Sequence, residues 1–500
     1  MNPNHTSNVL NEQSSNPEQS SGLPDVEGAH PPAGITNSSE AAIGAGASME
    51  PAAASALIAA EAVLSATASP GAETPRRRKL RRPRLAAPRI PGAGLPRRVR
   101  TLDSFSSPNY RLLWLSTLGI GGAGWIVDIV VGWLTYDLTR SPLLTGIALG
   151  LGALPFLLAG PFAGVIADSW DRRKLMMGAV IYLAAVMAAF TAVVLSGAIA
   201  TWMIFSFIFI YGFAYIVLHT TTMPMITAVV PRENLVNAFA LNALAFNAAR
   251  LVVPALAGTS IALFGPGITL VFAVATYAAA LIAVRAIRLD SVDFSDERRR
   301  PSLGKIVEGA RYIKSDPIVL GMFAMGILPL FFIAPVINGL MPVYAAEIFH
   351  VGPAGLGLLV SSLGAGATVG AIVIASLGSV RNKGRVLYVA IIIGALGMVA
   401  LSRAGSIYVA IPMLAIVSAT MATFFSVSTA IMQGNVPDSM RGRVAALSGM
   451  PLGLFPLGGA LAGGIAESIG APGATLVSAG LLAIFLGVFA ATFRSIWAIE

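Results

Sequence analysis

The sequence predicts an all-α membrane protein with twelve transmembrane helices arranged as two pseudo-symmetric six-helix bundles. The 500-residue chain is 55% hydrophobic and only 11% charged, which is about half the charged share of an ordinary soluble domain. Apolar segments of about 20–25 residues recur along it, and this is the length that crosses a hydrocarbon core of ~30 Å. Positive charges gather in alternate loops between these segments, as the positive-inside rule requires.

Residues 1–104 differ in composition from everything that follows and are expected to form a disordered cytoplasmic tail. They are rich in Ala, Ser, Pro, Gly and Asn and have little periodic apolar content, so they cannot bury a core. The tail ends in a basic run, which we interpret as an orientation signal that attracts anionic lipid, with about 1 kcal/mol per charge near the surface. No binding of nucleic acid is expected. The basic residues are Arg76, Arg77, Arg78, Lys79, Arg81, Arg82, Arg84, Arg89, Arg97, Arg98 and Arg100.

Six apolar segments are expected in an N-terminal bundle, residues 105–287, and six in a C-terminal bundle, residues 317–500. A charged cytoplasmic loop, 288–316, separates the bundles. The first six segments are 112–136, 143–167, 174–196, 201–227, 238–264 and 266–287. The second six are 317–341, 354–378, 385–403, 407–432, 444–468 and 472–494.

The loop charges fix the orientation that the sequence predicts. With the N-terminus inside, the outer loops carry only Arg140 and Arg403, and losing or adding one span would scramble this asymmetry. We therefore expect a monomeric, multi-pass protein of the plasma (inner) membrane with both termini cytoplasmic. The inner loops carry Arg172, Arg173, Lys174, Arg232, Arg285, Arg288, Arg298, Arg299, Arg300, Lys305, Arg311, Lys314, Arg381, Lys383, Arg385, Arg441 and Arg443.

The two halves echo each other in sequence. A Val-Pro pair followed by charged residues closes the fourth span at Val230 and the tenth span at Val436. Tyr110, before the first span, and Asp316, before the seventh, are separated by the same number of positions. Paired halves are how many secondary transporters build a binding site near the bilayer midplane.

Asp128 is the only acidic residue that the sequence places at membrane depth. A carboxylate there costs at least about 2.5–3.5 kcal/mol on insertion scales, so it is kept where it faces a cavity or a partner. The alternative is a structural acid that is hydrogen-bonded to a neighbouring helix. Three- and four-residue spacing puts it on an open stripe of the helix, made of Gly121, Gly124, Trp125, Asp128 and Gly132.

Other polar residues in the spans are candidates for lining a cavity. In the fourth span, Tyr211, Tyr215, His219 and Thr222 lie on one face, which is either a cavity wall or a lipid-facing or packing surface. Asn338, in the seventh span, could line a mirrored site in the second half.

Several sites are absent from the sequence. No GxxxxGK[ST] phosphate loop is present, so no ATPase activity is expected. The chain has no cysteine and four scattered histidines, which predicts no metal site, and no nucleophile–base pair is recognisable. We therefore predict neither an enzyme nor a cofactor.

The loop after the second span carries a glycine, an aspartate four residues later and a basic cluster. It resembles the signature loop of the major facilitator superfamily, in which this loop acts as a cytoplasmic latch, and its aspartate lies near a helix N-terminus. Ser169 and Asp171 depart from the family pattern. The alternative is a basic cytoplasmic turn. Gly164 and Asp168 match the pattern well. The predicted latch residues are Gly164, Asp168, Asp171, Arg172 and Arg173.

The fifth span resembles the span-five motif of exporters in that superfamily. Proline and glycine there would bend the helix and allow close packing, and Val253 replaces a glycine of the motif. A bent packing helix is the alternative. Arg250, the only cation that the sequence places within a span, could snorkel inward from the first half of span five or pair with a polar group in the core. The motif residues are Asn247, Arg250, Pro254 and Gly258.

Together with Tyr110–Trp114 and Thr139–Pro142, these motifs resemble the drug:H⁺ antiporter-type exporters, the group of macrolide and enterobactin exporters. The resemblance implies a proton-coupled exporter of an amphipathic small molecule, with Asp128 carrying the proton. One alternative is an uncoupled facilitator or lipid flippase on the same fold. Another is a membrane sensor or scaffold that acts through its tail.

Overall fold

The computed structural model describes residues 103–160, 170–288, 303–376 and 382–497. The chain divides into two units, Met1–Ser48 and Met49–Glu500, and all described residues belong to the second. These residues form helices and no strand. The predictions for residues 1–102, including the basic run, and for Gly164 and Asp168 concern positions outside the described residues.

In the described part of the N-terminal half, several α-helices begin at a side-chain cap. Ser107 caps the first helix and Ser141 the second, each followed by a proline at the first helical position, where its missing N–H is not needed. Asp171 caps the third. The helices are α2 (Pro108–Thr139), α3 (Pro142–Leu151, with further helix to Gly160), α5 (Arg172–Leu195), α6 (Thr201–Val229) and α7 (Leu235–Ala286).

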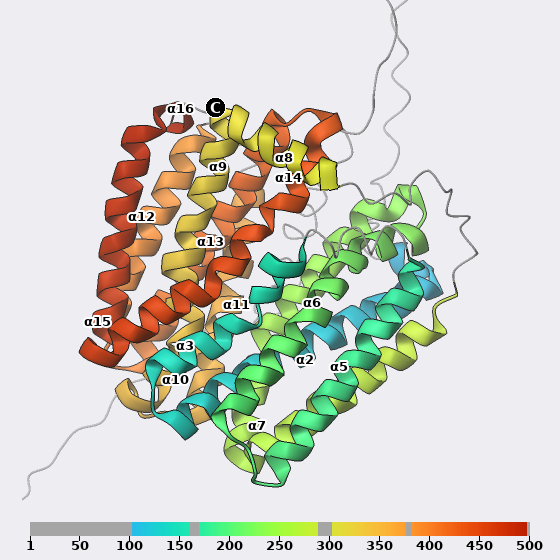
Figure 1. The fold of residues 1–500 in the computed structure, drawn as a ribbon, viewed down its shortest axis with the longest axis vertical. Coiled ribbons are helices and arrows are strands. Elements are labelled where there is room, and N and C mark those ends of the chain that lie inside the picture. Colours follow the sequence, from blue (N-terminus) through green and yellow to red (C-terminus); the bar gives the residue numbers. More distant parts are fainter. Residues whose placement is uncertain (1–102, 161–169, 289–302, 377–381, 498–500) are drawn as a thin grey trace, which may run out of the picture. The chain divides into compact units, whose positions relative to one another are not determined.

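The C-terminal half begins with the amphipathic helix α8 and continues through a seventh span made of short helical pieces (Figure 1). That span consists of α9 (Pro317–Leu328), the π-helical turns η4 (Pro329–Ile333) and η5 (Pro335–Gly339), α10 (Met341–Val343) and the π-helical turn η6 (Tyr344–Ile348). The remaining helices are α8 (Leu303–Ser315), α11 (Gly352–Ser376), α12 (Lys383–Ser402), α13 (Ile407–Asn435), α14 (Asp438–Ser448), α15 (Phe455–Thr492) and α16 (Arg494–Trp497).

Two long helices each contain a break that divides them into two spans. Within α7, Gly265 has a φ of 82°, and within α15, Gly470 has a φ of 78°. Only glycine adopts this conformation without strain, and a proline follows within two residues, at 266 and 472. The described chain has ten helices that are long and apolar enough to cross a membrane. The two breaks lie between the segments expected at 238–264 and 266–287 and between those expected at 444–468 and 472–494.

Prolines explain the irregular seventh span. A proline lacks the N–H that an α-helix would use and clashes with the carbonyl four residues earlier. Pro329 and Pro335 each open a π turn, and Pro342 lies in the short helix before the third. The span nevertheless continues to Ile348, beyond the end predicted at residue 341. Wide turns of this kind often lie at functional sites.

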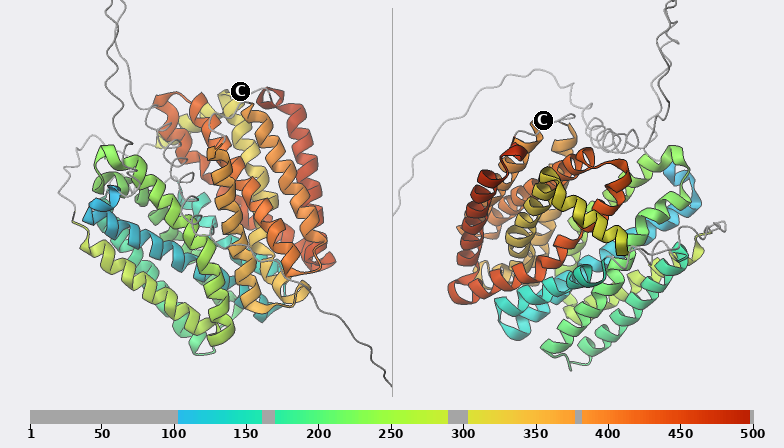
Figure 2. Two further views of the ribbon diagram at one scale, coloured as in Figure 1. Left: turned by 180° about the vertical axis from the view of Figure 1, so that it is seen from behind. Right: turned by 45° about the horizontal axis from the view of Figure 1, so that its top comes forward.

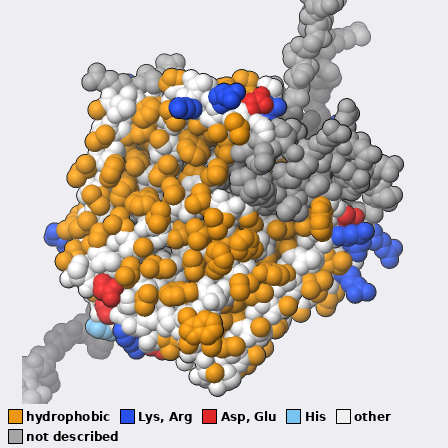
Figure 3. Space-filling model, in the orientation of Figure 1, with side chains coloured by type: hydrophobic (Ala, Val, Ile, Leu, Met, Phe, Trp, Pro, Cys, Tyr) orange, Lys and Arg blue, Asp and Glu red, His pale blue; other side chains and the backbone are white. Residues whose placement is uncertain are grey.

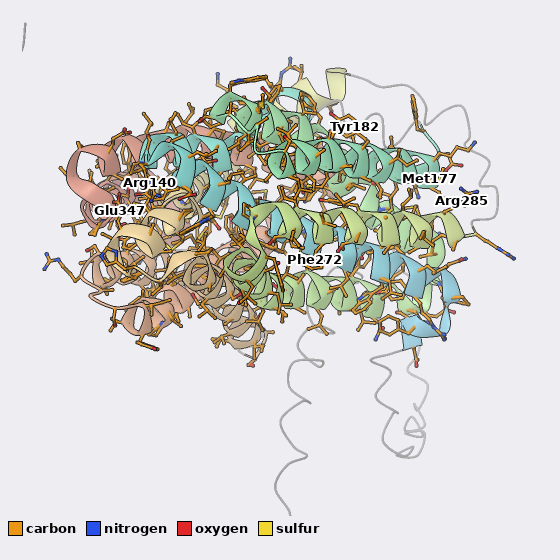
Figure 4. All side chains as sticks on the ribbon, turned by 90° about the horizontal axis from the view of Figure 1, so that it is seen from below. Arg140, Met177, Tyr182, Phe272, Arg285 and Glu347 are labelled. Atoms are coloured by element: carbon orange, nitrogen blue, oxygen red, sulfur yellow. The ribbon has the colours of Figure 1, made fainter. Side chains whose placement is uncertain are left out.

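The face of the helical body seen in Figure 3 is largely apolar, and its charges gather at the edges. Large side chains such as Leu263, Ile282 and Val488 are exposed, as expected for helices that contact lipid. Arg140 and Glu347 lie at one end of the helices and Arg285 at the opposite end (Figure 4). We call these the Arg140 end and the Arg285 end.

The two halves meet along two pairs of helices, α3 with α15 (Figure 1) and α7 with α11 on the reverse side (Figure 2). Both pairs use glycine for close backbone contact. A Cβ on Gly146 would lie 2.3 Å from the carbonyl oxygen of Gly459, and one on Gly258 would lie 2.3 Å from that of Pro353.

Candidate functional site

A cavity of about 140 Å³ lies between the two halves. Asp128 lines it from the N-terminal half and Asn338 from the C-terminal half, so two predicted site residues from opposite halves face the same space. Apart from these two, the lining is almost entirely apolar or aromatic. The remaining residues are Trp125, Ile129, Leu149, Pro342, Leu356, Val360 and Phe455.

Asp128 is the charged group of this cavity. Its neighbours Val127 and Ile129 are buried, at 0% and 2% exposure, whereas the Asp128 side chain is exposed to the cavity. Among the described residues, none donates a hydrogen bond to its carboxylate. The carboxylate therefore faces the cavity and is not held by a hydrogen bond from another described residue.

Three tyrosines of α6 and α7 lie within electrostatic range of Asp128. The carboxylate interacts electrostatically with Tyr211, Tyr215 and Tyr277. The hydroxyl groups of Tyr211 and Tyr277 are 2.9 Å apart. Gly124, one turn before Asp128, faces the Tyr211 hydroxyl, and a Cβ there would lie 3.4 Å from its oxygen, an ordinary van der Waals contact.

Tyr277 was not predicted from the sequence. It is fully buried in the second part of α7, and its role depends on Tyr211, which lies 66 positions earlier. The available signal was weak: a single phenol among the alanines and aliphatic residues of the sixth span. Spacing within that span does not link it to Asp128.

His219 lies further along α6, outside the cavity lining. Its ring packs edge-on against Phe156, with 5.8 Å between the ring centroids. Phe156 also contacts Tyr215, at 6.1 Å. The predicted stripe of α6 therefore has two parts: Tyr211 and Tyr215 beside Asp128, and His219 in an aromatic contact with the second span.

Arg250 packs against an aromatic ring in the core. Its guanidinium carbon lies 5.5 Å from the centroid of the Trp125 ring, a distance typical of a cation–π interaction. Its Nε is buried and has no hydrogen-bond partner in the described structure. Because Trp125 lines the cavity, Arg250 supports the cavity wall from behind.

The span-five motif lies at the interface between the halves. Pro254 is buried within α7, and its carbonyl oxygen would be 2.3 Å from a Cβ on Gly357 of α11. The N–H of Ala255 donates to the Ser361 hydroxyl of α11 over 3.0 Å. Asn247 is partly buried one turn before Arg250. In this structure the motif allows close packing of α7 against α11.

The hydrogen bonds of Asp171, Arg172 and Arg173, in the described part of the basic loop, are made within the N-terminal half. Asp171 accepts a hydrogen bond from the N–H of Lys174 at the start of α5. Arg172 donates to the carbonyl of Pro224 over 3.3 Å, and Arg173 donates to that of Arg285 over 2.5 Å. These bonds join α5 to α6 and α7. The predicted latch contact involves Gly164 and Asp168, which lie outside the described residues.

Comparisons with known proteins agree with this architecture. A model of the transmembrane secretion effector family matches residues 99–499. Macrolide efflux protein A of Streptococcus pyogenes is 24% identical over 355 residues, which cover 69% of this chain and 86% of the relative. The multidrug efflux pump Tap of Mycolicibacterium fortuitum is 24% identical over 388 residues, which cover 76% and 94%.

Solved structures show the same fold at low identity. A POT family transporter in complex with 5-aminolevulinic acid aligns with a TM-score of 0.65 at 11% identity, covering 78% of this chain and 97% of its own. The nucleoside transporter NupG aligns with a TM-score of 0.61 at 14% identity, covering 79% and 100%.

Proposed function

The chain belongs to the transmembrane secretion effector family of the major facilitator superfamily, and on this basis we propose that it is a proton-coupled exporter of amphipathic small molecules. Its family membership makes it a multi-pass membrane transporter and not an enzyme. The macrolide and multidrug efflux relatives support export as the direction of transport. The substrate would cross by alternating access of one site to the two sides of the membrane.

The observation that carries the proposal is the exposed carboxylate of Asp128 in an otherwise apolar cavity between two halves. Apolar and aromatic walls suit the apolar part of an amphipathic substrate. A carboxylate that meets water from alternate sides can take up a proton on one side and release it on the other. A proton or a substrate shifts the two access states only through its different affinity for them.

Charge at the two ends supports an orientation for this transport. The Arg285 end carries many basic side chains, among them Arg172, Lys314 and Arg443, whereas the loops at the opposite end carry Arg140 and Arg403. By the positive-inside rule, the Arg285 end and both termini would be cytoplasmic, and the Arg140 end would face outward across the plasma membrane.

Everted membrane vesicles test the proposal. We expect uptake of a macrolide, a dye or a siderophore in the presence of a pH gradient, and none after the gradient is collapsed. Asp128→Asn should abolish this uptake while the protein stays in the membrane at its normal amount. Asp137→Asn is the matched control, because Asp137 is exposed and pairs with Arg140 at 2.8 Å.

Unchanged uptake by Asp128→Asn would remove Asp128 from the mechanism. Flux that is insensitive to the collapsed gradient would instead support an uncoupled facilitator. Deleting residues 1–100 should leave uptake intact, whereas a scaffold acting through this tail would lose its effect.

A further inference from the structure

Two hydroxyl–carboxylate contacts join the halves at the Arg140 end. In the first, the Tyr136 hydroxyl at the end of α2 donates to Oε1 of Glu347 in η6. Tyr136 is 1% exposed, whereas Glu347 is exposed at the surface. Figure 4 places Glu347 beside Arg140 at this end of the molecule. The bond therefore links a buried residue of the N-terminal half to an accessible acid of the C-terminal half.

The second contact joins the start of α3 to α15. The Ser141 hydroxyl oxygen lies 3.2 Å from both carboxylate oxygens of Glu467. The same oxygen accepts the N–H of Leu144 as the cap of α3, so its one proton is directed to Glu467. This contact extends the glycine-packed α3–α15 interface to the end of the helices.

The first and seventh spans face each other in three layers between the cavity and this end. Asp128 and Asn338 line the cavity. In the next layer, a Cβ on Gly132 would lie 3.1 Å from Pro342 Cγ and 3.2 Å from a Leu149 methyl carbon. The helix α2 therefore touches α10 and α3 at this layer. The third layer is Tyr136 with Glu347. The layers are four residues apart along α2, as expected for one face of an α-helix.

The seventh span keeps this register through its last π turn. The residues of this span that form the three layers are 338, 342 and 347. The second interval is five residues instead of four, and it ends within η6, where the N–H of Phe349 donates to the carbonyl of Tyr344. An α-helix would instead turn by about 100° per residue, and position 346 would then face Tyr136. The π turn is therefore what brings Glu347 to the Tyr136 hydroxyl.

Building on the proposed function, we propose that Tyr136–Glu347 and Ser141–Glu467 form a clasp that closes the cavity toward the Arg140 end and must open for substrate release. Hydrogen bonds to a carboxylate are strong enough to favour the closed state and weak enough to break in each cycle. The charged residues next to Tyr136 are Asp137 and Arg140, which pair with each other over 2.8 Å. Of these, the Arg140 guanidinium carbon lies 5.8 Å from the Tyr136 ring centroid.

Site-directed labelling tests the clasp without requiring a substrate. The natural sequence has no cysteine, so Val360→Cys introduces a single thiol into the cavity wall. Intact cells are treated with a membrane-impermeant maleimide, and the rate of labelling reports access from outside. Ser468→Cys, on an exposed residue near the clasp, should label rapidly, and Lys314→Cys should stay unlabelled. These two reporters fix the orientation.

We expect slow labelling of Val360→Cys in the otherwise unchanged protein. Adding Tyr136→Phe or Glu347→Ala should speed labelling by about tenfold, the effect of losing one hydrogen bond to a charged group. The two changes together should act no more strongly than either alone, because they remove the same contact. Glu467→Ala should also speed labelling.

The matched control is Tyr344→Phe. Tyr344 is as buried as Tyr136, but its hydroxyl lies 2.8 Å from Thr475 within the C-terminal half, so labelling should not change. Rapid labelling of Val360→Cys alone would overturn the proposal, as would equal rates in all variants or labelling of Lys314→Cys from outside. If the unchanged protein exports nothing in vesicles but the clasp variants label faster as expected, the proposed function is wrong and the clasp proposal still holds.

Discussion

The N-terminal and C-terminal halves share an architecture but differ in chemistry. Each half ends in a long helix that a glycine with positive φ divides, Gly265 in one and Gly470 in the other. The N-terminal half places the carboxylate of Asp128 in the cavity lining, and it also contains the three tyrosines and the arginine described near it. The C-terminal half faces the cavity with Asn338 and with apolar residues such as Val360 and Phe455. The scaffold is therefore paired, whereas the ionisable site belongs to one half.

The C-terminal half differs in a second way. Its first span contains three π turns, whereas the equivalent helix α2 is a continuous α-helix of 32 residues. A regular helix holds Asp128 in a fixed direction. Wide turns interrupt the regular hydrogen-bond ladder and allow a helix to change register. One half therefore carries the charge on a regular helix, and the other faces it with a span that contains π turns.

Exchanging the two cavity residues tests this asymmetry most directly. We expect the double variant Asp128→Asn with Asn338→Asp to export no more than vesicles that lack the protein, because the tyrosines and Arg250 remain on the N-terminal side. Proton-driven uptake in everted vesicles is the measurement. Full export by the exchanged protein would show that the two positions are equivalent.

The glycines between the halves should respond equally at both interfaces. Gly146→Ala, at α3–α15, and Gly357→Ala, at α7–α11, each place a Cβ 2.3 Å from a carbonyl oxygen. We expect each to lower the free energy of unfolding by about 1–3 kcal/mol, as overpacking does. Gly178→Ala is the control, since a Cβ there meets nothing within 4 Å. Thermal unfolding in detergent would compare the stability of the three variants. If the substitution at one interface leaves stability unchanged, the two interfaces are not equivalent.

Two buried tyrosines allow the same change to be made in each half. Tyr277→Phe removes the partner of Tyr211 beside Asp128 and should lower export by about fivefold, the equivalent of one hydrogen bond of ~1 kcal/mol. Tyr344→Phe removes a hydroxyl that contacts Thr475, away from any cavity acid, and should lower stability but not export. Initial rates and unfolding temperatures separate the two effects. Equal losses of export would argue against a site confined to one half.

The ion pair between α8 and α14 should matter least. Glu308 and Arg443 are 2.5 Å apart, but their side chains are 51% and 29% exposed. Glu308→Gln should change the free energy of unfolding by less than about 1 kcal/mol, as for other surface pairs. Export rates should remain the same. A large loss of export would assign α8 a role in the transport cycle.

Much of the architecture follows from local sequence. The boundary predicted between the fifth and sixth spans, after residue 264, coincides with the break at Gly265, because the Gly-Pro pair is a local signal. The prediction for the seventh span stopped at residue 341, just before Pro342. The span continues to Ile348 through π turns, which pattern reasoning does not predict.

The candidate site was predictable only in part. Asp128 and Asn338 stand out because polar groups at membrane depth are rare, and both line the cavity. Tyr277, Phe156 and Glu347 were missed as site residues. Their contacts join segments 66, 63 and 211 positions apart, so no helical period within one span reveals them. The latch residues Gly164 and Asp168 stay a prediction.

The sequence by itself determined that the chain is a helical membrane protein, and it identified which polar residues at membrane depth are candidate site residues. Hydrophobic length, loop charge and the cost of a carboxylate in lipid are local properties, and they can be read from single segments. Only the tertiary structure decided which residues meet: Asp128 with its tyrosines, Arg250 with Trp125, and Tyr136 with Glu347. Those contacts depend on how closely backbones approach at glycine and on the register that a π turn gives to the seventh span.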